Sequence, residues 1–465
     1  MTADLATIAT DELVTQLREV VDGVPRDRCH VDAYFERVAF TSVRKTRASE
    51  SLSRVPSAVG LSFRVHVGRW HELGTQDLED VPKLREKLYS LADRDPEPLD
   101  VLPAWSVDAR VDCERPVDRV PVEEKLEKVR AFAKGMAGAD DRVVNPVVVY
   151  ADSVTEKVVV NNEGSVLRQI IPQVRLFLQP VAREGDRQDF DYFSLSGQGG
   201  WELVERVDDD LLEEVVRRSV TMLDAKAAPS GKMTVVLDPD VAGLVAHESF
   251  GHGLEADQVL RGRSYLEPLL GKLVASPVCN ISDSPVVPSA RGSYFFDDEG
   301  VKPEKTPLVE GGVLKNFIHE RASATAFGVK PRGNGRRESF AHRVNARMSN
   351  TFFEAGDYSE EEVFEGVSRG VFLERGYFGM EDPLGGGIQC TSKKGWLVEG
   401  GRKTTLLGPV TLSGRVLDLL KSIDAVGKDV APLHGGTCGK GTEDYVPVTS
   451  GGPFLRAREA VVGPG

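Results

Sequence analysis

The sequence is short of cysteine and of long apolar runs. Its 465 residues include five scattered cysteines, Cys29, Cys113, Cys279, Cys390 and Cys438, and no CxxC pair. An odd, dispersed set is not a disulfide framework, so we expect reduced thiols and a cytoplasmic location. No stretch approaches the roughly 18 to 20 apolar residues of a membrane span. The N-terminus also lacks a basic segment followed by an apolar core, so we expect neither a membrane partner nor a secretory signal.

Positive charge is also in deficit. Lys and Arg number 58 against 72 Asp and Glu, which gives a formal net charge of -14. A chain this acidic is poorly suited to bind a nucleic-acid backbone or an anionic membrane, so we expect no nucleic-acid partner. The apolar fraction of 40% and the charged fraction of 28% are ordinary for a globular protein. The length predicts two or more domains.

Hydrophobic periodicity in the first half changes between helical and strand spacing. Helices are predicted at 11–21, 81–93, 122–137 and 208–223, and strands at 61–70, 157–164 and 173–181. The proline-rich stretch 95–121 predicts a loop or an edge connection. Small residues with one Pro and one Gly at 227–232 indicate a domain boundary. We therefore predict an α+β fold in which residues 1–228 form an N-terminal α/β-type domain with antiparallel strands and helices.

The second half is rich in glycine and in short alternating segments. Strands are predicted within 312–320, 393–402 and 402–415, with turn signals between them. Residues 229–465 should therefore form a mostly antiparallel β domain that carries a few helices.

The segment MTVVLDPDVAGLVAHESFGHGLEAD (233–257) carries the clearest chemical signal. Residues 234–237 predict a short strand, Asp238 suits a helix N-cap, and Pro239 suits the first helical position. The helix ends at HESFGH, which contains His247, Glu248 and His252. Two histidines and an adjacent glutamate are the components of a hydrolytic zinc site, in which the glutamate takes a proton from metal-bound water.

The spacing of the two histidines is unusual, because they lie five residues apart instead of the four of HExxH. On a regular helix five residues turn the chain by about 500°, which leaves the second side chain about 140° away from the first. Both can face one ion only if the helix forms a π-type turn or unwinds between them. We expect Gly251 and Gly253 to make that distortion cheap through their backbone freedom.

A catalytic zinc site needs a third protein ligand. The candidates in the sequence are Glu255, Asp257, His319, His342, His434 and Cys438. Glu255 is close in sequence, but its helix ends at the glycines and its carboxylate is not expected to turn back. Cys438 lies in HGGTCGKG (434–441), predicted to be a glycine-rich loop, and a thiolate there would offset the charge of zinc. A lone cysteine is more often an inert buried residue, so the residues alone leave the third ligand open.

HESFGHGLEAD (247–257) is similar to HEAVGHGLEGD of the TldD branch of the TldD/PmbA metallopeptidase family. The resemblance extends to FFDDEGVKPEKTPLVEGGVLKNFIHERASA (295–324), to GNGRRESFAHRVNARMSNTFFEAG (333–356) and to GGTCGKG (435–441) with the following VPVTSGGPFLR. A looser match covers 31–77 and 122–226, so nearly the whole chain is included. The chain departs from the family pattern at Asn345 and in 258–270.

This resemblance implies that His247, His252 and Cys438 bind Zn²⁺ and that Glu248 is the general base. It also implies hydrolysis of unfolded or short peptides, held extended by strand pairing in an enclosed cavity, with leader trimming of a ribosomally made peptide as a family precedent. Relatives form dimers, either of one chain or of an active chain with a metal-free TldE/PmbA-type homologue. The chain keeps every metal residue of the active branch.

Several alternatives stay open from the sequence. His342 and Arg343 are candidates for the oxyanion donor, although a structural turn with solvated arginines explains their segment equally well. A metal-dependent amidase acting on a small molecule would use the same zinc chemistry. A non-catalytic partner subunit is the third possibility, and the intact Glu248 argues against it.

Overall fold

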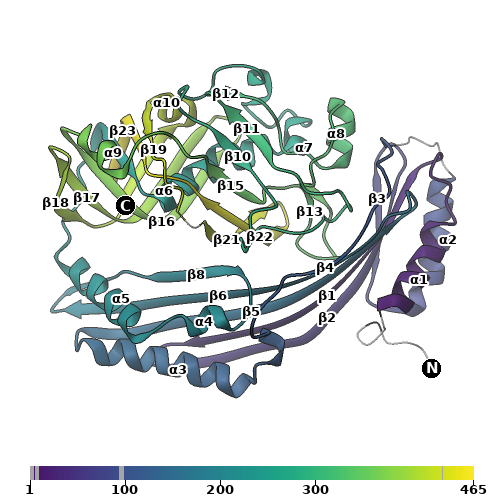
Figure 1. The fold of residues 1–465 in the computed structure, drawn as a ribbon, viewed down its shortest axis with the longest axis horizontal. Helices are drawn as coiled ribbons and strands as arrows, with labels where there is room; N and C mark the ends of the chain where they lie inside the picture. The colour runs from purple at the N-terminus through teal and green to yellow at the C-terminus, as the bar shows by residue number, and fades with distance from the viewer. Residues whose placement is uncertain (1–4, 6–9, 94–98, 432) are drawn as a thin grey trace.

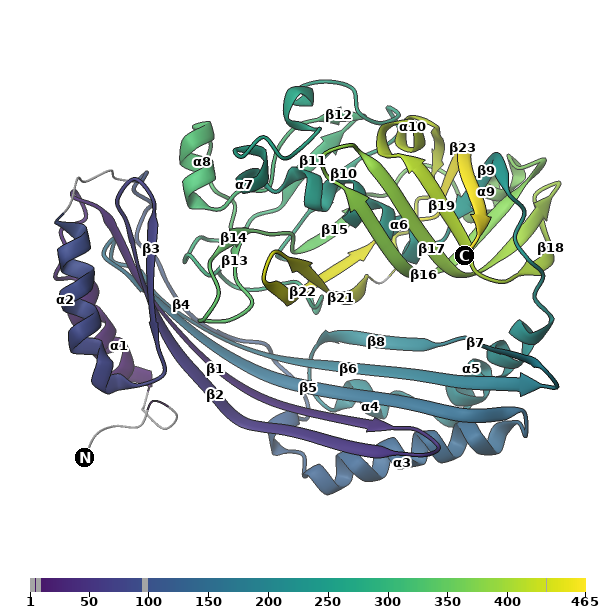
Figure 2. The ribbon, with the colours of Figure 1, turned by 180° about the vertical axis from the view of Figure 1, so that it is seen from behind.

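A long, curved sheet forms the N-terminal half of the molecule (Figures 1 and 2). The fold is that of a computed structural model, which describes residues 5, 10–93, 99–431 and 433–465. In this described part the sheet has eight strands in the order β3-β2-β1-β5-β6-β4, and β7 and β8 also pair with β6. The strands are β1 His30–Lys45, β2 Glu50–His66, β3 Trp70–Thr75, β4 Ser106–Arg110, β5 Val143–Asn161, β6 Val166–Glu184, β7 Arg187–Phe190 and β8 Phe193–Gln198.

Helices cover the convex face of this sheet near its two ends (Figure 1). They are α1 Thr10–Val21 and α2 Val81–Ala92 at one end, and α3 Val122–Ala139, α4 Glu202–Glu205 and α5 Asp209–Thr221 at the other. Each group closes its own apolar core against the strands. The four helices predicted from periodicity are confirmed, with bounds that differ by one or two residues.

One further prediction in this half changes in detail and another is confirmed. The strand predicted at 61–70 is the end of β2, a turn and the start of β3, because Gly68 adopts a left-handed conformation with φ 72° and the chain reverses there. The proline-rich stretch is an edge connection as predicted, since β4 pairs in parallel with β6 at the sheet edge. Residues 95–98 of that stretch lie outside the described residues.

The C-terminal half rests on the concave face of the long sheet and is built mainly from strands (Figures 1 and 2). One sheet follows the order β16-β9-β23-β19-β17-β18, and a further pairing of β16 with β17 closes five of these strands into a ring. Its strands are β9 Gly231–Leu237, β16 Arg369–Asp382, β17 Gly387–Glu399, β18 Arg402–Leu407, β19 Val410–Arg415 and β23 Leu455–Pro464, and β20 Ile423–Val426 also pairs with β23.

A second sheet of this half follows the order β12-β11-β10-β15-β22-β21. Its strands are β10 Ile281–Asp283, β11 Thr306–Glu310, β12 Val313–Leu314, β15 Asn350–Phe353, β21 His434–Lys440 and β22 Glu443–Gly451; β13 Gly335–Arg336 pairs with β14 Asn345–Ala346. The helices are α6 Pro239–Ala246, α7 Ala256–Val259, α8 Arg321–Phe327, α9 Glu360–Glu365 and α10 Val416–Lys421. Helix α6 packs between the two sheets, against β16 and β17 on one side and β15 and β22 on the other.

Two predictions for the second half are wrong in part. Only Val313 and Leu314 of segment 312–320 form a strand, because Gly311 and Gly312 form the preceding turn and the chain leaves the sheet after Leu314. The segment around Cys438 is not a loop: it is β21, paired antiparallel with β22 at the edge of its sheet. The α+β class with a β-rich C-terminal half is confirmed.

The two halves meet through apolar and ionic contacts. Tyr34, Val159 and Leu167 of the long sheet pack against Phe296 of the C-terminal half. Around them the ion pairs Arg64–Glu299 (3.1 Å), Glu163–Arg321 (2.7 Å) and Lys157–Asp298 (2.7 Å) cross the interface. The halves therefore support each other's geometry.

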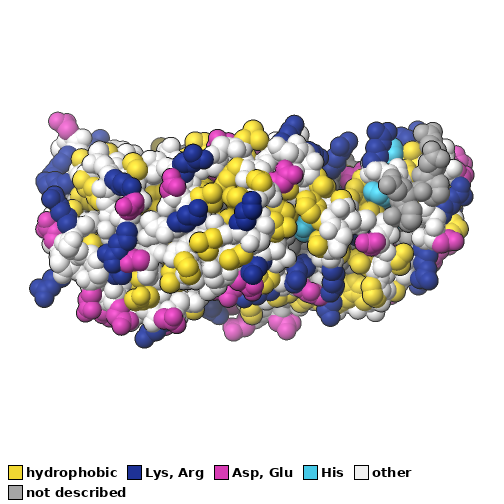
Figure 3. Space-filling model, turned by 90° about the horizontal axis from the view of Figure 1, so that it is seen from above, with side chains coloured by type: hydrophobic (Ala, Val, Ile, Leu, Met, Phe, Trp, Pro, Cys, Tyr) yellow, Lys and Arg dark blue, Asp and Glu magenta, His cyan; other side chains and the backbone are white. Residues whose placement is uncertain are grey.

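The surface opposite the long sheet carries mixed charge. Lys and Arg side chains are interspersed with Asp and Glu over this face, with apolar side chains between them (Figure 3). Among the described residues, no helix has the length and apolar character that a membrane crossing requires.

Candidate metal centre

Helix α6 carries the first histidine to the wall of a cavity. The Asp238 carboxylate caps the helix by accepting a hydrogen bond from the Val241 amide at 2.8 Å, and Pro239 occupies the first turn, as predicted. Val241 and Val245 are fully buried and hold the helix in the core between the sheets. The C-terminal end of the helix is thereby fixed.

The predicted irregularity between the histidines is present. Residues His247–Gly251 form a π-helical turn, and His252–Leu254 continue as a 3₁₀ turn. The reason for Gly251 differs from the expected one, because its φ of -75° and ψ of -76° need no left-handed freedom. An added Cβ at Gly251 would instead lie 1.7 Å from the Met348 sulfur. Glycine is required at this position because a side chain would collide with Met348.

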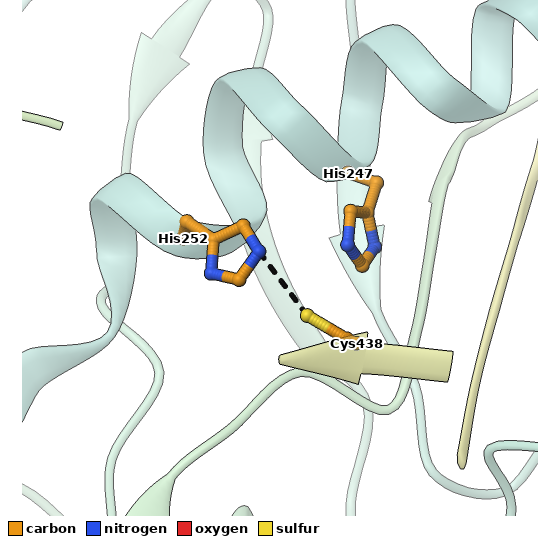
Figure 4. A group of neighbouring side chains, drawn as sticks. All are labelled: His247, His252 and Cys438. Carbon is orange, nitrogen blue, oxygen red and sulfur yellow. Dashed lines mark hydrogen bonds between the residues drawn. The ribbon is translucent and has the colours of Figure 1, made fainter. Parts of the chain in front are cut away.

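The distorted turn brings His247 and His252 together with Cys438 (Figure 4). One ligand atom from each of the three residues lies within 4.8 Å of the other two. The Cys438 sulfur is 3.1 Å from Nε2 of His252, and the two imidazole rings are nearly perpendicular, with centroids 5.3 Å apart. Cys438 reaches the histidines from β21, a strand that lies almost two hundred residues further along the chain.

The electrostatics of this group favour a thiolate. Burial alone would raise the pKa of Cys438, but His247 and His252 lower it well below its ordinary value. Burial likewise opposes charge on both imidazoles, yet the nearby Cys438 raises the pKa of His247, and Cys438 with Glu255 raises that of His252 well above normal. Positive charge on the two imidazoles is therefore stabilised by their acidic neighbours. Two imidazoles and a thiolate are a donor set that suits Zn²⁺.

A buried ionic network supports the group from behind. The Glu255 carboxylate lies 3.5 Å from Nδ1 of His252, so it contacts a histidine of the group without joining the group itself. Lys440 (3.1 Å) and Arg347 (3.3 Å) flank the same carboxylate. The Arg347 guanidinium also donates to the backbone oxygen of Cys438 at 2.7 Å and to Glu443 at 2.5 Å. These contacts hold β21 against the helix end.

Sequence reasoning missed the roles of Arg347, Lys440 and Glu443. Arg347 and Lys440 do lie in segments that carry the family resemblance, but no periodicity indicates what they contact. Burial gives the clearest signal, because Arg347 is fully buried and its charge must be compensated.

Glu248 lines the same cavity as the three candidate ligands. This cavity has a volume of about 1050 Å³ and also contains the candidate donors His342 and Arg343 in its wall. The Glu248 side chain packs against Gly379 of β16, where an added Cβ would lie 2.6 Å from its Oε1. Glu381, two residues further along β16, also faces the cavity, and both of its buried oxygens have no hydrogen-bond partner among the described residues. Burial, aided by Glu248 and opposed by His252, raises the pKa of Glu381 to about 9.

Three of the other candidate ligands are engaged elsewhere. Asp257 forms an ion pair with Lys440 at 2.6 Å, which places it behind the site. His319 contacts the Ser323 hydroxyl at 3.2 Å and packs against Phe327. His434 lies 3.4 Å from Asp240, at the opposite end of β21 from Cys438. Within the described residues, only His247, His252 and Cys438 form a group with ligand spacing.

Comparisons with known proteins agree with the sequence motifs. Residues 230–464 match the family model described as the PmbA/TldA metallopeptidase C-terminal domain, and residues 115–223 match its central domain. A protein of Methanothermobacter thermautotrophicus named a metalloprotease is 38% identical over 365 residues, which are 77% of this chain and 78% of the relative. A protein of Saccharolobus solfataricus named a zinc metalloprotease TldD homolog is 30% identical over 73% of this chain and 76% of its own.

A solved structure extends the likeness to the whole fold. The crystal structure of a Thermotoga maritima protein, described as a candidate modulator of a DNA gyrase, covers 98% of this chain and 100% of its own with a TM-score of 0.79. At 24% identity this likeness concerns the fold alone. The family models, together with the long and close sequence matches, show that this chain belongs to the PmbA/TldD family of metallopeptidases.

Proposed function

We propose that this protein is a zinc-dependent peptidase in which His247, His252 and Cys438 bind the ion and Glu248 is the general base. The observation that carries the proposal is the convergence of the three ligand atoms within 4.8 Å, on the wall of the cavity that also contains Glu248. A tetrahedral zinc centre needs donor atoms roughly 3 to 4 Å apart. A relative named a zinc metalloprotease adds support for the identity of the metal.

Zinc at such a site lowers the pKa of a coordinated water and polarises a carbonyl group. The residues of the chain supply the remaining functions. Glu248 Oε accepts the proton of the attacking water and passes it to the leaving amine. The contact with Gly379 restricts the Glu248 carboxylate, which keeps it directed into the cavity. His342 or Arg343, in the wall of the same cavity, donates a hydrogen bond to the developing oxyanion.

We propose unfolded or short peptides as the substrates, including the leader of a peptide under maturation. Strand β21 lies at the edge of its sheet, so an extended peptide can pair with those of its backbone groups that Arg347 and Arg291 leave unbound. Backbone pairing depends little on the side chains of the bound peptide. This edge, with a cavity of about 1050 Å³, favours a peptide over the small molecule of an amidase.

We also propose a dimer, formed with a second copy or with a metal-free TldE/PmbA-type homologue. The β16–β17 hairpin, beside the cavity, exposes Tyr377 and Phe378 of β16 and Leu384 of its turn by more than half of their surface. Apolar side chains gathered in this way are typical of an interface. Light scattering of the purified chain, alone and with the homologue, measures the assembly. All five cysteines are free thiols, which supports a cytoplasmic location.

Two substitutions separate the proposed roles. Glu248→Gln should retain stoichiometric zinc, measured by mass spectrometry of the metal, and lose about 10² to 10⁴ in the rate of peptide hydrolysis, because only the proton acceptor is removed. Cys438→Ser should lower zinc retention during dialysis against a chelator. Cys279→Ser, which also removes a buried thiol but lies outside the site, is the matched control.

The outcomes that oppose the proposal are specific. Wild-type turnover by Glu248→Gln would remove the base assignment. Equal zinc retention by Cys438→Ser and Cys279→Ser would remove Cys438 from the ligand set. Absence of hydrolysis for any peptide by the zinc-loaded wild-type protein, alone or with its homologue, would reject the peptidase function itself.

A further inference from the structure

A second cavity lies between the concave face of the long sheet and β21. Its volume is about 560 Å³, and its wall includes Arg175 of β6 and Arg291 of the C-terminal half. Apolar side chains and hydroxyl groups form much of the remaining wall: Phe40, Phe177, Leu195, Tyr445, Ser42, Ser153 and Ser194. A smaller cavity of about 320 Å³ shares Arg291 and Tyr445 with it and adds Arg336.

The arginines of these cavities have no acidic partner among the described residues. Arg291 is 9% exposed and donates Nε to the backbone oxygen of Gly436 at 3.1 Å. Arg336 donates to the backbone oxygens of Met348 and Pro447. Arg175 has neither a hydrogen bond nor an ion pair to any described residue; its open surface faces the cavity. Burial, and then the charges of Arg175 and Arg336, lower the pKa of Arg291 to about 9.

The carboxylates near this cavity do not neutralise Arg175 or Arg291. Asp152 belongs to the cavity wall, but its carboxylate binds the Lys125 ammonium at 2.6 Å and the Tyr150 hydroxyl at 2.5 Å. Lys125 is part of α3, which covers the opposite face of the sheet.

The carboxylates of the smaller cavity also have partners within the protein. Asp298 pairs with Lys157, and Glu36 accepts hydrogen bonds from the Tyr34 hydroxyl and the Phe340 amide. The Asp297 carboxylate accepts hydrogen bonds from the backbone amides of Glu299, Val301 and Gly335. The Glu338 carboxylate accepts hydrogen bonds from the backbone amides of Asp444 and Tyr445. Arg291 is a buried positive charge without a counter-charge, which is costly, and Arg175 beside it is an exposed positive charge without one, so a ligand that supplies a negative charge is favoured there.

The cavity reaches the candidate metal centre. Thr437 lines both the arginine cavity and the metal cavity, and it directly precedes Cys438 in β21. Strand β8, which contributes Ser194 and Leu195 to the arginine cavity, lies beside β21. A peptide that extends along β21 from the zinc ligands can therefore place one of its groups beside the two arginines.

We propose that Arg175 and Arg291 form a carboxylate-binding subsite for the peptide substrate. This inference rests on the proposed peptidase function and specifies its substrate as a peptide with a carboxylate at a fixed distance from the cleaved bond. The carboxylate is either an Asp or Glu side chain or the C-terminal carboxylate of the peptide. Arginine suits both, because its planar fork matches a carboxylate with two parallel hydrogen bonds.

Paired peptides distinguish the two sources. One series moves a single Glu along an otherwise neutral peptide, each member matched by its Gln counterpart, and a second pair differs only in a free or amidated C-terminus. The wild-type enzyme should cleave one acidic member, or the free-terminus member, about 10 to 100 times more efficiently in kcat/KM than its neutral counterpart. Equal values of kcat/KM within every pair would overturn the inference.

Arg175→Gln tests the subsite without removing any hydrogen bond or ion pair to the described protein. It should lower the acidic-to-neutral ratio of kcat/KM by about tenfold. Arg183→Gln is the matched control, because Arg183 is an exposed arginine of the same strand that lies outside both cavities, and it should keep the wild-type ratio. An unchanged ratio in Arg175→Gln would overturn the inference.

A binding measurement separates this inference from the peptidase function. In the Glu248→Gln background, fluorescence anisotropy of the preferred acidic peptide and its neutral counterpart reports affinity without turnover. Arg175→Gln in that background should reduce the affinity difference about tenfold. If the wild-type protein cleaves no peptide, the series is run by anisotropy alone. Equal affinities in every pair then reject the subsite, and a preference abolished by Arg175→Gln supports it although the peptidase function has failed.

Discussion

The Glu255 carboxylate joins the His252 imidazole to two basic side chains of the buried network. It lies within 3.5 Å of the His252 imidazole, the Lys440 ammonium and the Arg347 guanidinium, and it is almost completely buried. Burial opposes its charge, but Lys440 and His252 lower the pKa of Glu255 to about 2. The charged carboxylate fixes the His252 ring through Nδ1 and leaves Nε2 free for a metal.

Replacing this one carboxylate should weaken metal binding although no ligand changes. We expect Glu255→Gln to lower zinc affinity by about 10- to 100-fold, because the orientation of His252 is lost and Arg347 and Lys440 each lose one of their two carboxylate partners. Competition with a fluorescent chelator measures the affinity. Glu267→Gln, an exposed glutamate of the same region, is the control. Wild-type affinity in Glu255→Gln would contradict the supporting role.

The π-helical turn is the element that converts a five-residue spacing into a shared site. His247 and His252 face the same point only because Gly251 allows the turn to pack directly on Met348. The packing is tight enough that one added methyl group would collide with the Met348 sulfur. The element therefore depends on a contact with a residue almost a hundred positions away.

Gly251→Ala should displace His252 and lower zinc content to well below one ion per chain. Gly138→Ala is the control, since Gly138 lies in helix α3 with no atom within 4 Å of an added Cβ, and alanine there should stabilise the helix by about 0.5 to 1 kcal/mol. The double variant Gly251→Ala, Met348→Ala has a shorter side chain at position 348. It should therefore recover part of the zinc content. Full zinc occupancy in Gly251→Ala alone would show that the close packing is dispensable.

At the scale of the whole molecule, buried ion pairs join the long sheet to the C-terminal half. Arg321 of α8 binds Glu163 at 2.7 Å, and both contact His30 of β1. Burial would raise the pKa of Glu163, but His30 and Arg321 lower it to about 2. Because the folded pKa lies below the unfolded value of about 4.3, this group stabilises the fold fully above that value. The stabilisation is lost as pH falls from about 4 to 2.

Glu163→Gln should destabilise the protein at pH 7 by about 3 to 5 kcal/mol, since it leaves the buried Arg321 without its counter-charge. The difference from wild type should shrink as the pH falls below about 4. Denaturant unfolding at pH 7 and pH 3.5, with chelator in both buffers, checks this dependence. Glu310→Gln, at an exposed position, should match the wild-type protein at both pH values. A pH-independent difference would refute the linkage to Glu163.

The sequence by itself determined the local features of this protein. The strand before Asp238, the cap at Asp238 and the helix that follows depend on residues a few positions apart, so periodicity and capping predict them. The same is true of the helices that cover the long sheet. The family resemblance added Cys438, which spacing alone left among six candidates.

Only the tertiary structure decided which distant residues share a site. Cys438 reaches His252 because β21 pairs with β22, and β22 pairs with β15 beside helix α6. The same packing of sheets places Glu255 against His252 and determines the contacts of Arg347. The cavity around Arg175 forms because the C-terminal half lies in the concavity of the long sheet. Such contacts are set by the balance of burial and charge over the whole chain, which no short segment encodes.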